Sequence, residues 1–251
     1  MEATKTVYLP IIAYGGSCRI EFSMALAGLF INTIQNRSDI SFKSNPIAFE
    51  SLISRGRNAA AAAALHNQCD YLLFIDADIH FQSQDVFKLI DHNKDVVCGA
   101  YAKKYLNTKK IKRLTEISPE VFDTEEWKSL VTDFSSEISP EQTSDLIEVD
   151  YAATGFMLIK TNVFKKIALH FPKIKYRNDI DGYSAWGNNF YNFFPANINL
   201  ETLKYESEDY GFCNLWRSIG GKIHIDTSIQ IHHVGNMSFP GNLKKQLQIY
   251  K

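Results

Sequence analysis

The stretch Tyr71–Phe81, with the sequence YLLFIDADIHF, decides the fold. Its first five residues form an unbroken apolar run, which is typical of a β-strand buried on both faces of a sheet. Two aspartates, Asp76 and Asp78, follow directly. Because ligands of open α/β sheets bind at the carboxyl ends of the strands, we expect these two carboxylates at a functional site.

The Asp-Ala-Asp triplet at 76–78 permits two interpretations. Two carboxylates that flank a small residue can share one divalent cation, and hard cations prefer oxygen ligands. Aspartates at a strand end can instead cap the following turn or helix, which is a purely structural role. The position of the triplet at the end of a buried strand favours the metal site, because carboxylates there are costly without a cation.

The composition is that of an ordinary soluble globular protein. Of the 251 residues, 45% are hydrophobic and 22% are charged, which allows one large or two small domains. The formal net charge of -1 argues against a general attraction to nucleic acid or to anionic membranes, and leaves room for a local basic cleft. We therefore expect no nucleic-acid partner.

The cysteines and the N-terminus bear on the cellular compartment. Four widely spaced cysteines form no C-x-x-C motif, and Cys69 and Cys98 lie in or beside apolar runs, which predicts buried free thiols in a reducing compartment. The chain shows neither a secretory leader pattern nor an apolar stretch long enough to span a membrane. We expect a cytoplasmic protein, or the soluble catalytic part of something larger.

Strands and helices are expected to alternate along the chain, which predicts an α/β fold. The expected strands lie at 6–13, 40–42, 71–75, 95–99, 146–151, 155–160 and 222–226, and the expected helices at 20–34, 54–68, 85–93, 163–170 and 205–218. Ser54 and Asn162 are candidate N-caps of two of these helices.

The helix expected at 54–68 places two arginines where cations oppose the helix dipole. Arg55 and Arg57 lie in or next to its first turn, so we expect an anionic partner for them. That partner is a surface carboxylate, or it is Asp76 or a ligand phosphate held by the guanidinium fork. For Arg57 we favour the second alternative.

The segment from 100 to 144 has two unlike halves. A loop expected at 100–113 is strongly basic, with Lys103, Lys104, Lys109, Lys110, Lys112 and Arg113. Such a run is usually a solvated face, although the first two lysines could reach a phosphate near the strand end. The acidic, Ser/Pro-rich stretch 117–144 predicts an exposed excursion with a short helix near 119–130.

Three features of the C-terminal half suggest ligand contacts. The aromatic and amide-rich segment 177–194 suits sugar recognition, or it is a loop anchored by its rings. Glu206, Glu208 and Asp209 at a helix start complement the helix dipole, or one carboxylate meets a substrate hydroxyl. His232 and His233 point to opposite faces of an extended segment, and one of them could complete a metal site.

Six motifs follow one another along the chain: SRGRN at 54–58, DAD at 76–78, VVCGAY at 96–101, ATGFMLIK at 153–160, ESEDYGFCNLW at 206–216 and HHVG at 232–235. This ordered set resembles the motifs of the GT-A nucleotide-sugar glycosyltransferases. The resemblance is nearest to the small glycosyltransferases of large algal DNA viruses and covers about 6–235.

The resemblance implies a fold and an activity. The fold would be a single GT-A (Rossmann-like) domain over 1–251, with a mixed, mostly parallel central sheet flanked by helices. Residues 1–100 would form the nucleotide-binding half, 145–235 the sugar and acceptor half, and 103–144 a variable excursion. The activity would be Mn²⁺- or Mg²⁺-dependent transfer of a hexose or deoxyhexose from a UDP-sugar to a glycan, glycoprotein or other hydroxyl acceptor. The enzyme would act in the cytoplasm, the host cytoplasm if it is viral, without a membrane anchor.

The resemblance also implies a metal site. Asp78 and His233 would be metal ligands, with His232 as the alternative histidine. Asp76 would lie at the same metal or contact the ribose or an arginine.

Further residues are implied to contact the donor and the acceptor. Pro10, Ile12 and Tyr14 would lie near the uracil base, and Arg57 would lie near the diphosphate. Thr154 and Gly155 would line the donor sugar. Glu208 and Asp209 would contact sugar hydroxyls, or Asp209 would serve as the catalytic base if the reaction inverts the anomeric centre.

Two other functions remain open. A phosphatase-like hydrolase could use the first aspartate as a nucleophile with Mg²⁺, but the residues after the triplet, Ile79-His80-Phe81, lack the Thr or Val and the Gly that such sites usually have. A non-catalytic sugar-binding module would leave Asp76, Asp78 and His233 without a role.

Overall fold

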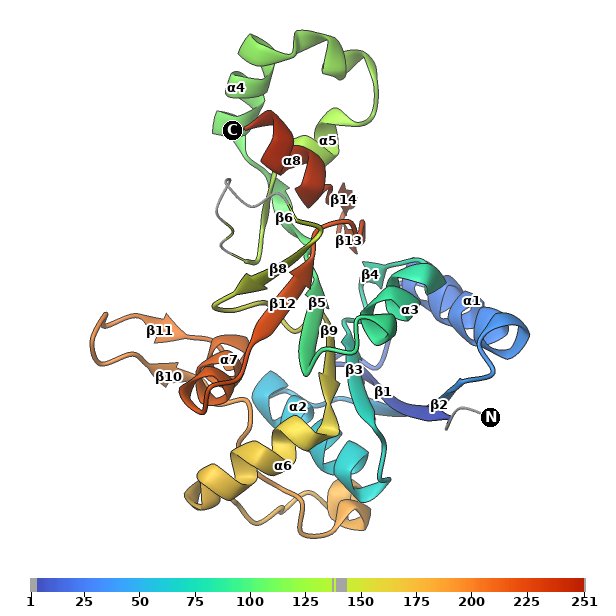
Figure 1. Cartoon of the computed structure of the whole chain (residues 1–251), viewed down its shortest axis with the longest axis vertical. Coiled ribbons are helices and arrows are strands. Elements are labelled where there is room, and N and C mark those ends of the chain that lie inside the picture. Colours follow the sequence, from blue (N-terminus) through green and yellow to red (C-terminus); the bar gives the residue numbers. More distant parts are fainter. Residues whose placement is uncertain (1–3, 137, 139–143, 251) are drawn as a thin grey trace.

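A seven-stranded sheet organises the computed structural model, which describes residues 4–136, 138 and 144–250 (Figure 1). Its strands, in spatial order, are β2 (Ile40–Ala48), β1 (Lys5–Ala13), β3 (Tyr71–Ile75), β9 (Phe156–Lys160), β5 (Val96–Gly99), β12 (Ile223–Asp226) and β8 (Leu146–Val149). All run in one direction except β9 and β8, which are antiparallel to their neighbours. The expected mixed, mostly parallel central sheet flanked by helices is confirmed.

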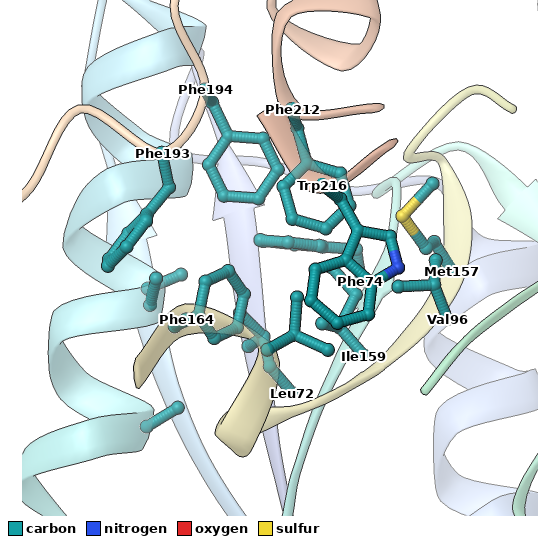
Figure 2. Close-up of a cluster of buried hydrophobic side chains, with 14 of the residues drawn as sticks. Leu72, Phe74, Val96, Met157, Ile159, Phe164, Phe193, Phe194, Phe212 and Trp216 are labelled. Carbon is teal, nitrogen blue, oxygen red and sulfur yellow. The ribbon is translucent and has the colours of Figure 1, made fainter. Parts of the chain in front are cut away.

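The buried strand β3 divides the core into two layers. Leu72 and Phe74 pack on one face with α2 (Ile53–His66), α6 (Thr161–His170) and α7 (Glu208–Ser218), as Figure 2 shows for the two side chains among the aromatic rings. Tyr71, Leu73 and Ile75 pack on the other face with α1 (Ile20–Asn36) and α3 (Ser83–Asp91). Both faces are covered, as the continuous apolar run predicts.

The alanine-rich helix α2 lies close to the sheet because its six consecutive alanines, residues 59–64, are fully buried. Its N-cap is Leu52, without a side-chain hydrogen bond, so the prediction that Ser54 caps this helix is wrong. Asn162 is not a cap either, because α6 begins at Thr161 after Lys160.

The expected basic loop at 100–113 is instead a strand and a helix, β6 (Ala102–Leu106) and α4 (Thr108–Ile117). Asn107 caps the helix by accepting hydrogen bonds from the backbone N–H groups of Lys109 and Lys110, a local signal that the charge run obscured. The short helix expected near 119–130 corresponds to η1 (Pro119–Asp123) and α5 (Trp127–Leu130).

The described part of the excursion has a core of its own, so the expectation of a merely exposed segment is wrong. Strand β7 (Thr132–Phe134) pairs with β6, and α8 (Leu243–Ile249) packs beside α5. Leu114, Leu130 and Val131 are buried between them. Residues 137 and 139–143 of the expected excursion lie outside the described residues.

A small second sheet brings the C-terminal histidines to the Asp-Ala-Asp triplet. Its strands are β14 (Ser238–Pro240), β13 (His232–Val234) and β4 (Ile79–His80), with His233 opposite Ile79. A hairpin of β10 (Asn197–Ile198) and β11 (Tyr205–Glu206) delays the start of α7 to Glu208. The remaining elements are η2 (Pro172–Ile174) and η3 (Asp181–Trp186). Within the described ranges, we find no helix that is long and apolar enough to cross a membrane.

Candidate functional site

A cavity of about 710 Å³ opens where β1 and β3 end. Its wall is formed by the end of β1, the turn before α1, the start of α2, the Asp-Ala-Asp triplet and one residue of β13. The lining residues include Ile12, Tyr14, Arg19, Glu50, Arg57, Asp76, Asp78 and His233. The structure therefore places the triplet at a cavity, as its position after a buried strand predicts.

Asp78 lies between two cationic or potentially cationic groups. The Nζ atom of Lys104 is 2.5 Å from its Oδ2 atom, and the Nε2 atom of His233 is 3.4 Å from its Oδ1 atom. Burial acts to raise the pKa of Asp78, but the contacts with His233 and Lys104 outweigh it and lower that pKa to about 2. Asp78 is therefore ionised at neutral pH.

The orientation of His233 is fixed by the backbone. Its Nδ1 atom lies 2.9 Å from the carbonyl oxygen of Ala102, which can only accept a hydrogen bond, so we assign the proton to Nδ1. Nε2 then faces Asp78. The ring of Tyr101 packs edge-on against the imidazole, with the ring centroids 5.2 Å apart. These contacts hold His233 in the orientation that a metal-ligating histidine needs.

His232 lies elsewhere. Its Nδ1 atom contacts the hydroxyl of Ser238 at 3.2 Å, and its ring packs edge-on against His80. Burial and the neighbouring His80 lower the pKa of His232. Of the two histidines, the structure brings His233, not His232, beside Asp78.

Arg57 joins the triplet to the start of α7. Its Nη2 atom lies 3.3 Å from Oδ1 of Asp76, and its Nε atom lies 3.2 Å from Oε1 of Glu208. The guanidinium also covers the ring of Phe74 at 5.2 Å. The side chain is only 5% exposed, and its Nη1 atom has no hydrogen-bond partner among the described residues. Because the Nη1 atom is itself buried, a ligand in the cavity would reach it only if the guanidinium shifted.

Thr154 and Gly155 lie beneath Asp76 rather than in the cavity wall. The N–H of Asp76 donates to the carbonyl of Gly155 at 2.9 Å. A Cβ atom at Gly155 would lie 2.6 Å from the hydroxyl of Tyr101 and 2.7 Å from Oδ2 of Asp76. Burial above all raises the pKa of that Tyr101 hydroxyl. Direct contact of Thr154 and Gly155 with a donor sugar stays a prediction.

Of the three residues expected near the uracil base, two line the cavity and one does not. Ile12 and Tyr14 line the cavity, and Tyr14 is 72% exposed at its mouth. Pro10 is buried within β1.

The two acids of α7 lie behind the wall of this cavity. Glu208 contacts it through Arg57. One carboxylate oxygen of Asp209 accepts hydrogen bonds from the hydroxyl of Ser207 and, at 2.9 Å, from the N–H of Tyr210. Their catalytic roles stay predictions.

Arg19 was not predicted to lie at the site, and Lys104 was predicted only as an alternative phosphate contact. Arg19 precedes α1, and its backbone N–H donates to the carbonyl of Ala77 at 2.9 Å, which places its exposed side chain at the cavity. Lys104 could not be distinguished from the other basic residues at 103–113. Strand alternation after the correct boundary of β6 could have separated its direction from that of Lys103.

The aromatic segment 177–194 anchors the fold more than it lines a site. Phe190, Phe193 and Phe194 are buried in the core beside Phe164 and Phe212, and Figure 2 shows four of these rings together. The prediction that these three phenylalanines recognise a sugar is therefore wrong. Their burial follows from the small alanine face of α2, which leaves room for large rings.

A second, larger cavity of about 1120 Å³ lies along α7, β8 and the β10–β11 hairpin. Tyr151 and Tyr210 stack in its wall with ring centroids 3.9 Å apart. Glu206 is held there by hydrogen bonds of 2.8 Å from the side-chain amides of Asn199 and Asn214. Aromatic faces beside fixed carboxylates and amides suit saccharides.

Asp78 and His233 present the donor atoms that a divalent cation such as Mn²⁺ or Mg²⁺ accepts, a carboxylate oxygen and an imidazole nitrogen. Both are oriented by other contacts and converge on one place, so these residues fit a metal that takes its remaining ligands from a bound phosphate or water. No group of three or more His, Cys, Asp or Glu side chains suited to a metal occurs in the described part of the chain. Oδ1 of Asp76 is taken by Arg57, and the metal role of Asp76 stays a prediction.

A family model named Anp1, a glycosyltransferase-family domain, matches residues 48–163. The matched segment contains α2, the Asp-Ala-Asp triplet and β9. It supports a glycosyltransferase at the general level. A search of curated proteins found no match.

Two solved structures are similar to this chain at low identity. One is a crystal structure of GalNAc-T7 with UDP, GalNAc and Mn²⁺, with a TM-score of 0.44 and 9% identity over 94% of this chain, which spans 45% of the GalNAc-T7 chain. The other is 4-diphosphocytidyl-2C-methyl-D-erythritol synthase from Anaerococcus prevotii DSM 20548, with a TM-score of 0.35, 12% identity and coverage of 71% of this chain and 81% of that chain. Because both TM-scores are below 0.5, neither likeness assigns a function.

Proposed function

We propose that the protein is a metal-dependent glycosyltransferase that moves a sugar from a UDP-sugar to a hydroxyl acceptor. The observation that carries the proposal is the convergence of Asp78 and His233, with Oδ1 and Nε2 3.4 Å apart, in a cavity that Arg57 also lines. An anionic ligand bound at a cation site would account for this combination at the end of a buried strand.

Asp78 and His233 would hold Mn²⁺ or Mg²⁺. The bound metal would act as a Lewis acid that stabilises the charge on the departing diphosphate. Arg57 and Arg19, which both line the cavity, would add positive charge beside that diphosphate, and the charge of Arg57 is held in place by its contacts with Asp76 and Glu208. Asp76 would keep Arg57 in place.

The UDP-sugar donor would contact mainly residues from the first half of the chain. Ile12 and Tyr14 would contact the base at the mouth of the cavity, with Pro10 shaping β1 behind them. Thr154 and Gly155 would support the sugar site from below through Asp76. Residues 1–100 would thus form the nucleotide-binding half and residues 145–235 the sugar and acceptor half.

The acceptor would approach from the side of α7. Its first turn separates the two cavities, because Glu208 contacts Arg57 while Tyr210 lines the larger cavity. We propose that a glycan acceptor lies in the larger cavity. Asp209 would accept the acceptor proton in an inverting reaction or orient a hydroxyl in a retaining one.

The test is a screen of nucleotide sugars for Mn²⁺-dependent donor hydrolysis, with the variant Asp78→Ala and the exposed control Asp123→Asn. We expect hydrolysis of at least one UDP-sugar by the wild type and the control, and none by Asp78→Ala. Wild-type activity in Asp78→Ala would remove the metal role.

A thermal-shift panel distinguishes the alternatives. Stabilisation by UDP only with Mn²⁺ supports the transferase. Stabilisation by phosphate or vanadate with Mg²⁺ would indicate a phosphatase-like hydrolase instead, and stabilisation by free saccharides alone would indicate a sugar-binding module.

A further inference from the structure

A basic hollow of about 630 Å³ lies between the β6–β7 ribbon, α4 and α8. Four cationic side chains line it, Lys103, Lys109, Lys110 and Arg113, with the ring of Tyr250 on the α8 side. The hollow is separate from the cavity at the Asp-Ala-Asp triplet. Lys103 and Lys104 are neighbours on β6 and their side chains leave opposite faces, so Lys104 reaches Asp78 while Lys103 lines the hollow.

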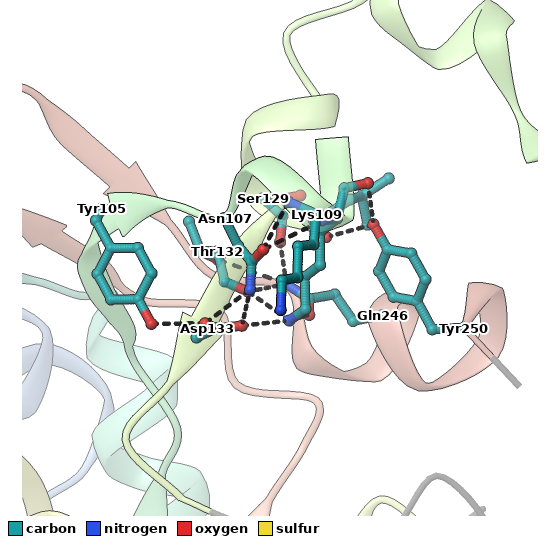
Figure 3. Close-up of polar contacts among 10 residues, drawn as sticks. Tyr105, Asn107, Lys109, Ser129, Thr132, Asp133, Gln246 and Tyr250 are labelled. Carbon is teal, nitrogen blue, oxygen red and sulfur yellow. Dashed lines mark hydrogen bonds and ion pairs between the residues drawn. The ribbon is translucent and has the colours of Figure 1, made fainter. Parts of the chain in front are cut away.

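The acid in this hollow, Asp133, is already satisfied by its own neighbours. Its carboxylate accepts hydrogen bonds from the hydroxyl of Tyr105 at 2.6 Å and from the amide of Asn107 at 3.0 Å, as the dashed lines of Figure 3 show. It also pairs with Lys110 at 2.9 Å. Burial acts to raise the pKa of Asp133, but contacts with Tyr105, Lys110 and Asn107 lower it. Asp133 therefore neutralises the charge of Lys110, and its carboxylate has little capacity left to pair with the other cations.

Among the described residues, the other three cations have no such partner. Over residues 4–136, 138 and 144–250, no ion pair joins Lys103, Lys109 or Arg113 to an acid. The guanidinium of Arg113 stacks over the ring of Tyr250, with its central carbon 5.4 Å from the ring centroid. A guanidinium held by its flat face keeps its N–H edge for a ligand.

The wall opposite these cations is held by buried hydrogen bonds. Gln246 is 5% exposed and donates to the carbonyls of Ser129 at 2.8 Å and Thr132 at 3.1 Å, while it accepts from Lys110 at 2.8 Å. The hydroxyl of Tyr250 donates to the carbonyl of Leu130 at 3.0 Å. Figure 3 shows Gln246 and Tyr250 extending from α8 into this network. Like charges repel, so cations gathered against a fixed wall favour an anionic ligand.

We propose that this hollow binds a phosphate-bearing anion, either a small phosphate compound or a lipid headgroup. Arg113 would bind phosphate oxygens with two parallel N–H groups, and Lys103 and Lys109 would add point charges. The volume lies in the range of small-ligand sites. The proposal does not depend on glycosyl transfer, because the hollow lies across β6 from the triplet.

The first experiment measures binding of inorganic pyrophosphate by isothermal titration calorimetry at physiological ionic strength, without divalent metal. The test variant is Lys109→Gln with Arg113→Gln. The matched control is Lys112→Gln with Lys165→Gln, two exposed lysines outside the hollow. We expect binding at least about tenfold weaker in the test variant, because two charge-assisted contacts are lost, and unchanged binding in the control.

The second experiment separates the two sources of phosphate by sedimentation with vesicles of phosphatidylserine and phosphatidylcholine, or of phosphatidylcholine alone. Binding of pyrophosphate assigns the site to small phosphates. Binding to the anionic vesicles alone, lost in the test variant, assigns it to a lipid headgroup. Wild-type binding of neither probe, or binding that the test variant retains, would overturn the proposal. Far-ultraviolet circular dichroism and the thermal midpoint verify that both variants fold.

Discussion

The ammonium nitrogen of Lys104 lies 2.5 Å from Oδ2 of Asp78, on the carboxylate that also faces His233. The stem of Lys104 runs beside Gly235, where a Cβ atom would lie 3.2 Å from Cδ of the lysine. Glycine at 235 therefore lets the lysine reach the acid. A divalent cation bound by this carboxylate would have to compete with the ammonium.

We predict that Lys104→Gln binds Mn²⁺ more tightly than the wild type in the absence of nucleotide. The lysine and the aspartate are both about one-third exposed, so the pair is worth about 1 kcal/mol or less, which corresponds to a gain of up to about fivefold. Isothermal titration calorimetry with Mn²⁺ measures it. Lys103→Gln removes the same charge on the other face of β6 and should change the affinity little. Weaker or unchanged Mn²⁺ binding in Lys104→Gln would contradict the competition.

Arg57→Met is predicted to destabilise the fold and to abolish UDP binding. The change leaves Asp76 and Glu208 near each other without their shared cation. Both acids are partly exposed, so we expect a cost of about 1–3 kcal/mol, below that of breaking a fully buried pair. Urea unfolding measures the loss. The control is Arg217→Met, whose partner Asp150 is exposed, and it should cost at most about 1 kcal/mol.

Arg57→Lys separates folding from binding in the same experiment. A lysine keeps the charge but lacks the planar fork that contacts two acids and still presents a donor to the cavity. We expect a smaller loss of stability with UDP binding weakened at least about tenfold. Unchanged UDP affinity would show that the guanidinium of Arg57 does not contribute to nucleotide binding.

The half of the site nearest the N-terminus could be predicted from local patterns. A continuous apolar run at Tyr71–Ile75 identifies a strand buried on both faces. Asp76 and Asp78 follow it directly, so they lie at its carboxyl end whatever the rest of the chain does. Arg57 follows in the same way, because an arginine near the start of a helix needs an anion. These inferences use only neighbours in sequence.

The other half depends on contacts that no local pattern encodes. His233 reaches Asp78 because β13 pairs with β4, and alternation predicts its face without naming the strand it joins. The family resemblance, not periodicity, selected His233 over His232. Helix α8 was not predicted at all, since it is seven residues long and is held by Gln246, a polar residue whose carbonyl partners lie 114 to 117 positions away.

Gly155→Ala is predicted to disturb the triplet. The added methyl group would lie 2.7 Å from Oδ2 of Asp76 and 2.6 Å from the hydroxyl of Tyr101, so at least one of them must move. Crowding of this kind costs about 1–3 kcal/mol, and we expect weaker UDP and Mn²⁺ binding with it. Thermal unfolding and calorimetry measure both. Gly182→Ala, where the new methyl group meets no atom within 4 Å, is the control. Equal behaviour of the two variants would contradict the close packing.

The buried acid at the end of β12 contributes to the pH dependence of stability. Asp226 is 3% exposed, with Oδ2 at 2.8 Å from Nε2 of His92. Its Oδ1 accepts from the N–H and hydroxyl of Ser228 at 2.8 and 2.6 Å. Burial acts to raise the pKa of Asp226, but contacts with Ser228 and His92 lower it below its ordinary value. The charged form therefore stabilises the folded protein.

Asp226→Asn is predicted to lower the free energy of unfolding at about pH 7 by about 1–3 kcal/mol, because asparagine removes the charge that the hydrogen bonds stabilise. The folded pKa lies below the unfolded pKa, so this stabilisation is fully present above the unfolded value of about 3.9 and is lost as the pH falls through the folded value. Urea unfolding of both proteins at about pH 5 and 3 should show a smaller difference at the lower pH. The exposed control Asp179→Asn should match the wild type throughout. A difference that grows on acidification would mean that Asp226 is stabilised in its protonated form.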